Sequence, residues 1–345
     1  MSPSSQLNDK SEKEWNDTMT TQQMQYIIAL TEEGNFSAAA KKLFVTQPSI
    51  SQLIKNMESQ IGTPLFDRTT TPVRLTTVGR AYYEAAKKIE SINRELDNRV
   101  SEINELKSGS LTIGTSPFRA SCMLPKSISC FKEQYPGIQI RIVTDHIENL
   151  KGQLLDGEID ICIDNDVFDN PFFMTEELAE ETYYLAINKN NPWNQGKETR
   201  ALTPEDILND SEKLYADEQI TADELGALSF ILLDAKSEHY DISLTIFEKL
   251  SVQPPVSMYA TNIETKFHWT NSNLGAAFLP DTLIRFGNFI EHPVYYKIQE
   301  PKNTLGLCQE KIVVAYDKHH YLTKAAREYI LQLKKLIGMG TWLLH

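Results

Sequence analysis

Between Asn35 and Arg74 the chain contains two short helical patterns that meet at a tight turn, followed by a basic hairpin pattern. The first helical pattern covers Asn35–Leu43 and the second covers Thr46–Ile61, so two residues separate them. A helix-turn-helix joins two short helices by such a tight turn. The spacing therefore predicts a helix-turn-helix, a motif typical of proteins that bind DNA.

Both helical patterns begin or end with residue types that favour a helix boundary. Asn35 and Thr46 are suitable N-cap residues, because their side chains can accept hydrogen bonds from the first free N–H groups. Pro48 is tolerated in the first turn of the second helix, where N–H groups lack partners anyway. Gly62 can adopt the left-handed conformation that ends a helix.

The second helix separates apolar from polar residues at helical spacing. Ile50, Ile54, Met57 and Ile61 recur on one face and are expected to face the body of the domain. The other face is polar and uncharged apart from one lysine: Gln47, Ser49, Ser51, Gln52, Lys55 and Ser59. Gln can pair with an adenine edge at two positions, Ser can donate or accept, and a Pro ring can touch a thymine methyl. This face therefore predicts contact with the major groove, with an ordinary polar surface helix as the alternative.

A basic hairpin pattern follows Gly62. Two short extended stretches flank a tip rich in Thr and Pro, with Arg68 and Arg74 on its two sides, which resembles the wing of a winged helix. These arginines can lie against phosphates or reach a narrow minor groove, and the alternative is a surface ion pair such as Arg68 with Asp67. The predicted DNA-binding residues are thus Asn35, Thr46, Gln47, Pro48, Ser49, Ser51, Gln52, Lys55, Arg68 and Arg74.

Residues 77–107 predict one long helix, without Gly or Pro after Gly79. Heptad spacing places a seam of apolar residues along it, interrupted by Arg99: Tyr82, Ala85, Ile89, Ile92, Leu96, Ile103 and Leu106. A helix with one apolar stripe needs a partner helix, and the simplest partner is the same helix of a second copy. The seam therefore predicts a homodimer or a tetramer.

Residues 20–107 resemble the winged helix-turn-helix and linker helix of the LysR-type transcriptional regulators. The matching stretches are Asn-Phe-Ser-Ala-Ala-Ala at 35–40, Thr-Gln-Pro-Ser-Ile-Ser at 46–51, Leu65-Phe66 with Arg68, and Leu75-Thr76 with Gly79. Two features depart from the family. Residues 1–19 precede its usual start and read as a disordered tail, and Gln52-Leu53 stand where many members have Arg and Gln or Ala.

From Leu111 the pattern changes to strands that alternate with helices. Strands at 111–114, 138–143 and 159–163 alternate with helices at 124–135 and 149–155, which predicts a β-α-β-α-β unit with parallel strands. Further strands are expected at 182–188, 229–233, 256–260, 274–279 and 312–316, and further helices at 243–250, 264–270 and 323–337, the last capped by Thr323. Two α/β lobes joined by two crossing segments would bind a small ligand between them.

This half is also similar to the effector domain of the LysR-type family, whose fold is that of type 2 periplasmic binding proteins. The similar pieces include Gly-Ser-Leu-Thr-Ile-Gly at 109–114, Leu124-Pro125, Tyr135-Pro136 and Leu-Gly-Ala-Ala-Phe-Leu-Pro at 274–280, whereas 194–218 looks like extra sequence. The resemblance implies a multi-domain fold: an all-α winged helix-turn-helix with a long linker helix, then an α/β two-lobed effector domain. The expected boundaries are a tail at 1–19, the DNA-binding domain at 20–76, the linker at 77–108 and the effector domain at 109–345, with lobe I at about 109–166 and 317–345 and lobe II at about 167–316.

Effector-binding residues follow from the geometry and the resemblance together. The loop 115–119 enters a helix N-terminus, where Thr115 and Ser116 can hold a carboxylate or similar anion and Arg119 can add charge. The other candidates are residues at strand ends or, in the family's arrangement, facing the cleft: Pro117, Thr144, His146, Asn165, Thr261 and Asn262. For each, the alternative is an ordinary turn or helix cap. The expected effector is a small molecule, with an anion as one candidate.

Charge and composition limit the classes of partner and the cellular location that the sequence allows. The chain carries a net charge of −13, yet residues 35–80 hold six basic against two acidic residues, so the acidity is no argument against DNA. No stretch approaches eighteen apolar residues and the N-terminus has no apolar signal core, which predicts a soluble cytoplasmic protein that does not bind membranes. The four cysteines are expected to be reduced thiols.

Two other functions are alternatives for such a sequence. An α/β enzyme has little support, because Gly-x-Ser-x-Gly, His-Glu-x-x-His, Gly-x-Gly-x-x-Gly and phosphate-loop motifs do not occur, and neither a cofactor nor a metal is expected. A thiol-sensing regulator of the same fold is the sharper alternative, but Cys122, Cys130, Cys162 and Cys308 show no nearby resolving pair in the sequence. The sequence thus favours an effector-controlled transcriptional regulator that binds double-stranded DNA and works with RNA polymerase.

Overall fold

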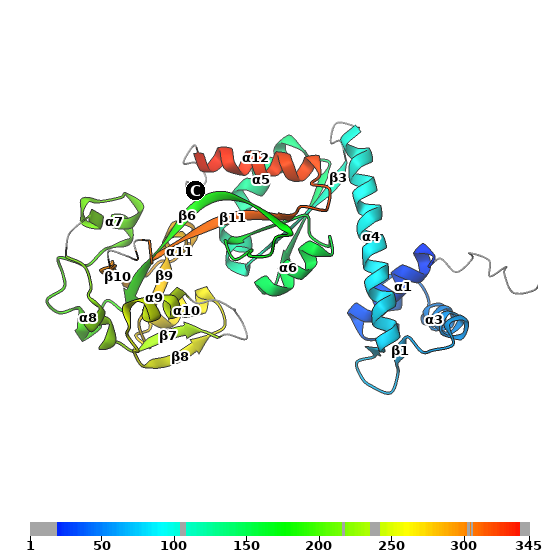
Figure 1. Cartoon of the computed structure of the whole chain (residues 1–345), viewed down its shortest axis with the longest axis horizontal. Coiled ribbons are helices and arrows are strands. Elements are labelled where there is room, and N and C mark those ends of the chain that lie inside the picture. The colour runs from blue at the N-terminus through cyan, green and yellow to red at the C-terminus, as the bar shows by residue number, and fades with distance from the viewer. Residues whose placement is uncertain are drawn as a thin grey trace, which may run out of the picture. The chain divides into compact units, whose positions relative to one another are not determined.

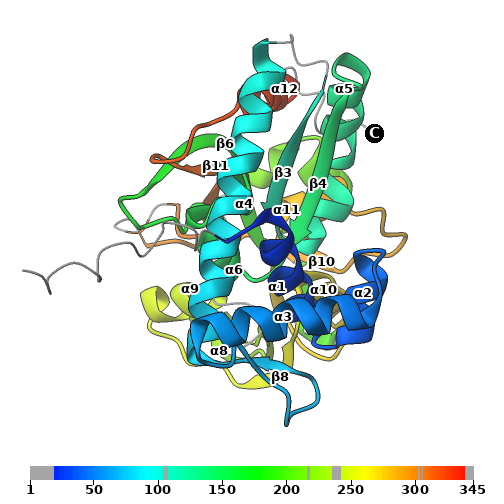
Figure 2. The same ribbon diagram turned by 90° about the vertical axis from the view of Figure 1, so that its right-hand side faces the viewer.

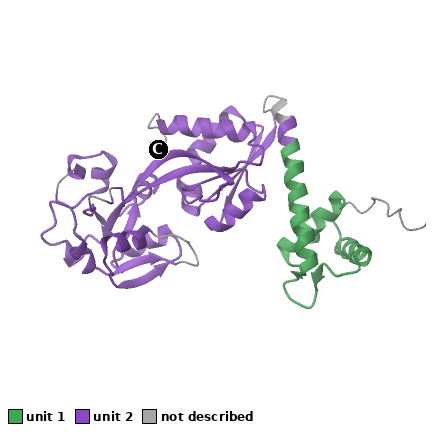
Figure 3. Ribbon diagram, in the orientation of Figure 1, with its two compact units in different colours: residues 1–96 green, residues 97–345 purple. Residues whose placement is uncertain are grey.

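The computed structural model describes residues 19–103, 108–215, 218–234, 242–301, 304 and 306–338. The chain divides into two compact units, residues 1–96 and 97–345 (Figure 3). Of the tail expected at 1–19, all but Met19 lies outside the described residues. No helix among the described residues has the length and apolar character needed to cross a membrane.

The first unit is helical with one small hairpin (Figure 1). Its elements are α1 (Thr21–Glu33), α2 (Phe36–Lys42), α3 (Gln47–Ile61), β1 (Phe66–Asp67), β2 (Arg74–Leu75) and α4 (Thr77–Ile103). The two predicted short helices and the hairpin are confirmed. Buried residues of α1, α2 and α3 form one core with Leu65 and Phe66 from the start of the wing. The predicted long helix is also confirmed up to Ile103, and residues 104–107 lie outside the described residues.

Helix α1 was not predicted, although its boundary signals are present in the sequence. Thr20 and Gln23 form a reciprocal capping box, with the Thr20 hydroxyl accepting from the Gln23 N–H and the Gln23 side chain accepting from the Thr20 N–H. Gly34 ends the helix with a φ of 58°. This helix supplies Ile27 and Leu30, both fully buried, as the floor on which α2 and α3 pack.

The second unit is built around a mixed sheet in the order β10-β6-β11-β5-β3-β4. Strand β3 (Gly109–Thr115) pairs in parallel with β4 (Ile138–Thr144) and β5 (Ile161–Asn165). Helices α5 (Pro125–Gln134) and α6 (Ile147–Leu155) make the two connections, so the predicted β-α-β-α-β unit is confirmed. Figure 2 shows β3 and β4 next to each other, with α5 at the same end as α12 (Lys324–Gly338).

Two long strands connect the α/β halves of this unit. The first part of β6 (Phe173–Ile187) pairs antiparallel with β11 (Gln309–Asp317), which in turn pairs with β5. The last part of β6 leaves β11 and pairs instead with β9 (Ala277–Pro280) and β10 (Val294–Tyr296). Strand β6 is thus shared by two groups of strands, and β11 links it to β5. Figure 1 shows β6 in green and β11 in orange.

The remaining elements surround the far end of β6. They are β7 (Phe230–Leu233), α9 (Ile242–Leu250), β8 (Val256–Ala260), α10 (Ile263–Asn271), α11 (Asp281–Phe286), α7 (Pro204–Leu208), α8 (Ala222–Gly226) and the short helical turns Pro192–Asn194 and Glu212–Tyr215. A further short helical turn, Arg119–Met123, lies between β3 and α5. The predicted helices and strands from Ser229 onward are all found, the strand at 256–260 with its predicted bounds and the others with shifted ends. Thr323 caps α12 by accepting a hydrogen bond from the Ala326 N–H. Helices α7, α8 and α11 and strand β10 were not predicted.

Helices α7 and α8 repeat one local design. Each follows a Thr N-cap that forms a reciprocal capping box, Thr203 with Asp206 and Thr221 with Glu224. In each case the residue before the cap is a buried aliphatic that forms an isolated β-bridge, Leu202 with Tyr295 and Ile220 with Ile298. The first repeat falls within the stretch 194–218 that looks like extra sequence.

Candidate DNA-binding surface and effector cavity

We call the predicted DNA-binding domain, residues 20–76, the reading head. The ends of its helices α2 and α3 follow the predicted boundaries, with one difference. Asn35 caps α2, and its Oδ1 accepts hydrogen bonds from the N–H groups of Ser37 (2.8 Å) and Ala38 (3.2 Å). Gly62 ends α3 in the left-handed conformation with a φ of 78°. Thr46 occupies the N-cap position of α3, but its hydroxyl makes no capping bond and lies 2.8 Å from the Ser49 Oγ instead.

Helix α3 presents the predicted polar face. Ile50, Ile54 and Met57 are buried, and Ile61 packs against the same core. Ser51 is half-buried, and the other predicted contact residues of the helix are exposed: Gln47, Pro48, Ser49, Gln52 and Lys55. The Gln52 amide donates to the Asn56 Oδ1 at 2.8 Å, which restricts its side chain. The face is therefore open to a partner and carries few charges.

The wing packs against the turn between α1 and α2. Strands β1 and β2 pair antiparallel with Phe66 opposite Leu75. The Val73 N–H donates to the Gly34 carbonyl at 2.8 Å, and a Cβ on Gly34 would lie 2.7 Å from the Pro72 Cβ. Glycine is therefore required at position 34 for two reasons: the backbone is left-handed there, and the wing approaches too closely for a side chain.

Arg68 forms an ion pair, but with a different partner from the one considered. Its Nη2 lies 2.7 Å from the Glu58 Oε2, and its guanidinium lies 5.3 Å from the centre of the Phe36 ring. Asp67 instead accepts hydrogen bonds from the N–H and hydroxyl of Thr69. Arg74 is exposed and forms no ion pair with the described residues.

Glu58 was not predicted to have a role, and it joins α3 to the wing. Its Oε1 accepts from the N–H groups of Leu65 (2.9 Å) and Phe66 (3.2 Å), while its Oε2 binds Arg68. One carboxylate therefore fixes the first strand of the wing relative to the helix. In the sequence, the signal for a role of Glu58 is its position directly after Met57, within the part of the chain that resembles the LysR-type family.

The predicted seam of α4 divides into two parts. Near its start, Tyr82 and Ile89 are half-buried against residues of the head, with Ala86 fully buried beside Met24 and Ile28. Farther along, the exposed apolar residues are Ile92 (63%), Leu96 (59%) and Val100 (50%). Ala85 is half-buried; the side chain of Ile103 and all of Leu106 lie outside the described residues.

The second unit contains a cavity of about 390 Å³. Eight of the nine residues predicted to bind the effector line it: Ser116, Pro117, Arg119, Thr144, His146, Asn165, Thr261 and Asn262. They come from the ends of β3, β4, β5 and β8 and from the helices that follow, which is where convergent polar groups are expected in such folds. The structure thus brings these residues together around one space.

Thr115 does not line the cavity. Its side chain is fully buried, and its hydroxyl donates to the Ile163 carbonyl of the neighbouring strand β5 at 2.7 Å. The predicted use of this hydroxyl for an anion is therefore wrong, because the group holds two parallel strands together instead.

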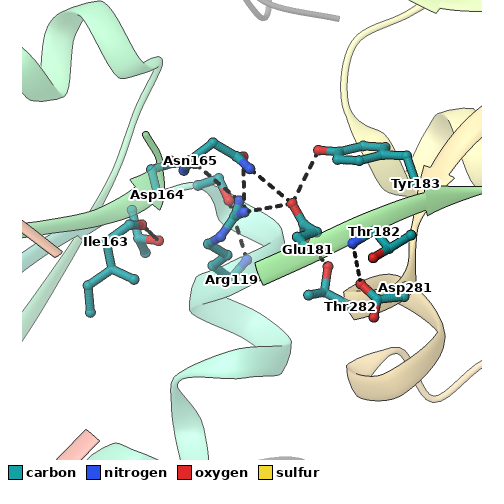
Figure 4. Close-up of polar contacts among 11 residues, drawn as sticks. Arg119, Ile163, Asp164, Asn165, Glu181, Thr182, Tyr183, Asp281 and Thr282 are labelled. Carbon is teal, nitrogen blue, oxygen red and sulfur yellow. Dashed lines mark hydrogen bonds and ion pairs between the residues drawn. The ribbon is translucent and has the colours of Figure 1, made fainter. Parts of the chain in front are cut away.

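Arg119 is buried in a network of carboxylates rather than presenting a spare charge (Figure 4). Its Nη1 lies 3.1 Å from the Asp164 Oδ1, and its Nη2 lies 3.2 Å from the Glu181 Oε2 and 3.0 Å from the Asn165 Oδ1. Burial raises the pKa of Asp164, and the nearby guanidinium partly offsets that rise. Two of the groups on which an anionic effector was expected, Thr115 and Arg119, are thus engaged within the protein.

Glu181 on β6 is the centre of this network, and no role was predicted for it from the sequence. It is 1% exposed, and its Oε2 also accepts from the Asn165 amide at 3.0 Å and the Tyr183 hydroxyl at 3.2 Å. Its Oε1 accepts from the Thr282 hydroxyl, at the start of α11. Glu181 therefore connects the helical turn at 119–123 and the end of β5 to the elements at the far end of β6.

The four cysteines do not form a reactive thiol pair in the described structure. All are free; Cys162 and Cys308 are buried, and Cys122 and Cys130 are half-buried. Burial raises the pKa of Cys122, with a contribution from Glu264, and raises the pKa of Cys162 well above its ordinary value. Raised pKa values leave these two thiols protonated and slow to oxidise.

Family models match both units of the chain. The model described as bacterial regulatory helix-turn-helix protein, lysR family, matches residues 21–80. The model described as LysR substrate binding domain matches residues 104–211 and 207–337.

The chain belongs to the LysR family of bacterial transcriptional regulators.

Relatives and solved structures of the LysR family match most of the chain. It is 27% identical over 266 residues to a probable RuBisCO transcriptional regulator of Emiliania huxleyi, covering 75% of this chain and 78% of the relative. It is 24% identical to the HTH-type transcriptional regulator YybE of Bacillus subtilis, covering 90% and 97%. The fold is similar to that of CbnR in complex with its target DNA, with a TM-score of 0.64, 18% identity and coverage of 92% and 99%.

Membership of the LysR family settles the general function. The protein is a DNA-binding transcriptional regulator with an effector-binding domain, and the family is one of regulators rather than enzymes. Among the described residues, no group of three or more His, Cys, Asp or Glu side chains could hold a metal ion.

Proposed function

We propose that this LysR-type regulator reads a specific duplex sequence with α3 and acts as a homodimer or a dimer of dimers. The observation that carries the proposal is the exposed polar surface of α3, where Gln47, Ser49 and Gln52 are exposed while Ile50 and Ile54 are buried. Side chains of this kind distinguish base pairs by hydrogen bonds at the floor of the major groove. Asn35, Thr46, Pro48, Ser51 and Lys55 complete the proposed contact surface.

The wing supplies affinity rather than sequence preference. Arg74 is exposed beside the tip, and Arg68 is held by Glu58 close to it. Contacts of both guanidinium groups with phosphates would make binding depend steeply on salt. Because Arg68 is already paired, its contact with DNA needs little ordering of its side chain.

Pairing of two chains is proposed to occur along α4. Ile92, Leu96 and Val100 recur every four residues and form one exposed apolar face. Exposed apolar residues in a continuous row are typical of an interface. Two reading heads on one duplex would then recognise two half-sites.

The cavity is proposed to hold the small-molecule effector that controls the regulator. We place the DNA-binding domain at 20–76, the linker at 77–108 and the effector domain at 109–345, with lobe I at about 109–166 and 317–345 and lobe II at about 167–316. An effector that touches Ser116 from one lobe and Thr261 from the other stabilises a closed arrangement, and the pairing of effector domains changes with it. Through the linker this respaces the heads on DNA and alters contact with RNA polymerase in the cytoplasm.

The proposal is tested with the full-length protein and DNA selected by it from a random duplex library. Gln47→Ala and Gln52→Ala should relax the preference for the selected site over its single-base variants, because each good base contact contributes about 1–3 kcal/mol of discrimination. Arg74→Ala should weaken all sites alike and make the salt dependence shallower. Gln60→Ala, at the exposed far end of α3, is the matched control. An unchanged base preference in both Gln variants would show that another surface reads the DNA.

A further inference from the structure

We propose that Asn56 determines which base Gln52 accepts, so that Gln52 reads adenine and rejects guanine. This inference rests on the proposed role of α3 as the DNA-reading helix, and it names one base pair of the site and the residue that selects it. Asn56 is a positioning residue here: it acts through Gln52 and contacts no base itself.

Gln52 and Asn56 lie on the same outward side of α3. They are four residues apart, a spacing that brings two side chains together on one face of a helix, and both are exposed. The Gln52 Nε2 donates a hydrogen bond to the Asn56 Oδ1 at 2.8 Å. The two amides are therefore joined on the surface that α3 offers to DNA.

This hydrogen bond changes what the Gln52 amide offers to a base. A free glutamine amide has two N–H donors and one carbonyl acceptor. With one N–H donating to Asn56, one N–H and the Oε1 remain. In the major groove adenine presents one acceptor and one donor, N7 and N6–H, whereas guanine presents two acceptors, N7 and O6. The held amide therefore matches adenine, and it lacks the second donor that guanine requires.

Gln47, the other glutamine of α3, has no such restraint. Its side chain is exposed and forms no hydrogen bond with the described residues. Both of its N–H groups and its Oε1 stay available, so a rotation of the amide matches it to adenine or to guanine. The two glutamines should therefore differ: selection is sharp at the base pair that Gln52 contacts and broad at the one that Gln47 contacts.

The position of Asn56 along the helix favours an indirect role. In a helix-turn-helix, the N-terminal residues of the second helix contact the base edges. Helix α3 begins at Gln47, so Gln52 lies within about its first two turns and Asn56 lies beyond them. Asn56 is thus placed to orient Gln52 from the side that is farther from the base edges.

The restraint also reduces the entropy that Gln52 loses on binding. Glutamine has a long side chain that gives up rotamer freedom when it is ordered at an interface. The hydrogen bond to Asn56 orders part of this side chain before DNA binds. Only a duplex with the matching adenine gains from the ordered amide, so Asn56 adds to base preference and not to affinity for DNA in general.

The test uses the full-length protein and a duplex that it selects from a random library. The base pair that Gln52 contacts is the one whose preference Gln52→Ala relaxes, and affinities are then measured with A·T or G·C at that position. Wild type should favour A·T, and Asn56→Ala should narrow the ratio of the two affinities about two- to tenfold. The preference at the Gln47 position should stay the same. Selection of guanine by wild-type Gln52, or an unchanged ratio in Asn56→Ala, would overturn the inference.

A second substitution of Asn56 separates positioning from direct reading. Asn56→Asp keeps the acceptor oxygen that Gln52 needs and adds a negative charge near the phosphates. It should weaken both duplexes alike and leave the ratio of their affinities as in wild type. If Asn56→Asp narrows the ratio as much as Asn56→Ala does, the amide of Asn56 reads the base itself and the inference is overturned.

The helix should stay folded in these variants, which keeps the comparison interpretable. Alanine is favourable within a helix, and Asn56 is exposed, so thermal unfolding of Asn56→Ala should match that of wild type. Gln60→Ala is the matched control, because Gln60 is an exposed amide on the same helix that forms no hydrogen bond with the described residues. It should leave the ratio of affinities unchanged.

A double variant shows through which side chain Asn56 acts. When Gln52 is already alanine, Asn56→Ala should cause no further change in the ratio, because the two substitutions remove the same contact. A further loss of preference in the double variant would show that Asn56 contacts DNA independently of Gln52, against the inference.

The outcomes separate this inference from the proposed function. If neither Gln47→Ala nor Gln52→Ala alters the base preference, the proposed reading surface is wrong and the inference falls with it. If Gln52→Ala relaxes the preference and Asn56→Ala does not, the reading surface stands and the assignment of Asn56 is wrong.

Discussion

The guanidinium of Arg99 lies 4.4 Å from the centre of the Tyr321 ring. Arg327 approaches the same ring at 5.3 Å and donates to the Tyr321 hydroxyl at 3.2 Å. Arg99 belongs to the end of α4 that is part of the second unit, and Tyr321 lies three residues before the start of α12 in the same unit. The charged residue that interrupts the apolar seam of α4 therefore has a contact of its own within the effector domain.

This stack should contribute measurably to the stability of the second unit. A cation–π contact at a partly exposed site contributes about 0.5–1 kcal/mol. A double-mutant cycle with Arg99→Ala and Tyr321→Leu, followed by urea unfolding of the full chain, should give a coupling energy of that size. The same cycle with Arg80→Ala in place of Arg99→Ala should give none. Additive effects of Arg99→Ala and Tyr321→Leu would contradict the contact.

Removing the carboxylate of Glu58 should loosen the wing. Glu58→Ala leaves the N–H groups of Leu65 and Phe66 without their acceptor, and each unsatisfied group costs about 1–3 kcal/mol. We expect lower stability of the head in urea unfolding and weaker binding to all DNA sites, with the base preference kept. Gln60→Ala, at an exposed position two residues along α3, is the control. A changed base preference would indicate that Glu58 positions α3 rather than the wing.

A charge in the exposed row of α4 should separate the chains. Leu96 is 59% exposed between Ile92 and Val100, and a carboxylate there would be buried in any paired seam. Leu96→Asp should halve the mass measured by sedimentation and weaken DNA binding. Ser91→Asp, on the opposite side of the helix by its 100° spacing, should leave the mass unchanged. A dimer that survives Leu96→Asp would place the interface on another surface.

The ion pair of Glu224 with Arg200 should make the free energy of unfolding depend on pH in the acidic range. The two side chains meet through contacts of 3.0 and 2.8 Å, and the hydrogen bond from Arg200 is the main reason that the pKa of Glu224 falls from 4.5 to about 2. A depressed folded-state pKa adds stability above the unfolded value and loses it as pH falls through the folded value. Allowing for partial exposure, the contribution at neutral pH is about 2 kcal/mol.

Glu224→Gln isolates this contribution. The stability difference between wild type and variant, measured by urea unfolding, should be constant from pH 7 to pH 5 and shrink as the pH falls below 4.5 towards 2. Glu212→Gln is the matched control, because Glu212 forms no ion pair with the described residues. A difference that stays constant down to pH 3 would mean that the ion pair does not stabilise the folded state.

The parts of the fold with local signals could be predicted from the sequence. Asn35, Gly62 and the apolar spacing of Ile50, Ile54 and Met57 define α2 and α3 within a few residues, because capping and periodicity are properties of neighbouring positions. Strand β6 was predicted nine residues too late. Its first half carries Glu176, Glu177 and Glu180, which hide the strand pattern until the apolar run from Tyr184 begins.

The contacts that define the sites depend on residues far apart in the chain. Arg119 meets Asp164 and Glu181, which lie 45 and 62 positions away. Nothing near Arg119 in the sequence indicates that its charge is neutralised, just as nothing near Thr115 indicates the carbonyl of Ile163. Sequence position could show that these residues lie at strand ends, while their availability to a ligand depended on the packing of parallel strands.

Helices α7 and α8 are each anchored independently to the second unit. Each copy supplies its own cap, its own buried aliphatic residue and its own bridge to the chain near β10. Neither helix relies on the other for these bonds, so the loss of one cap leaves the cap and the bridge of the other helix in place.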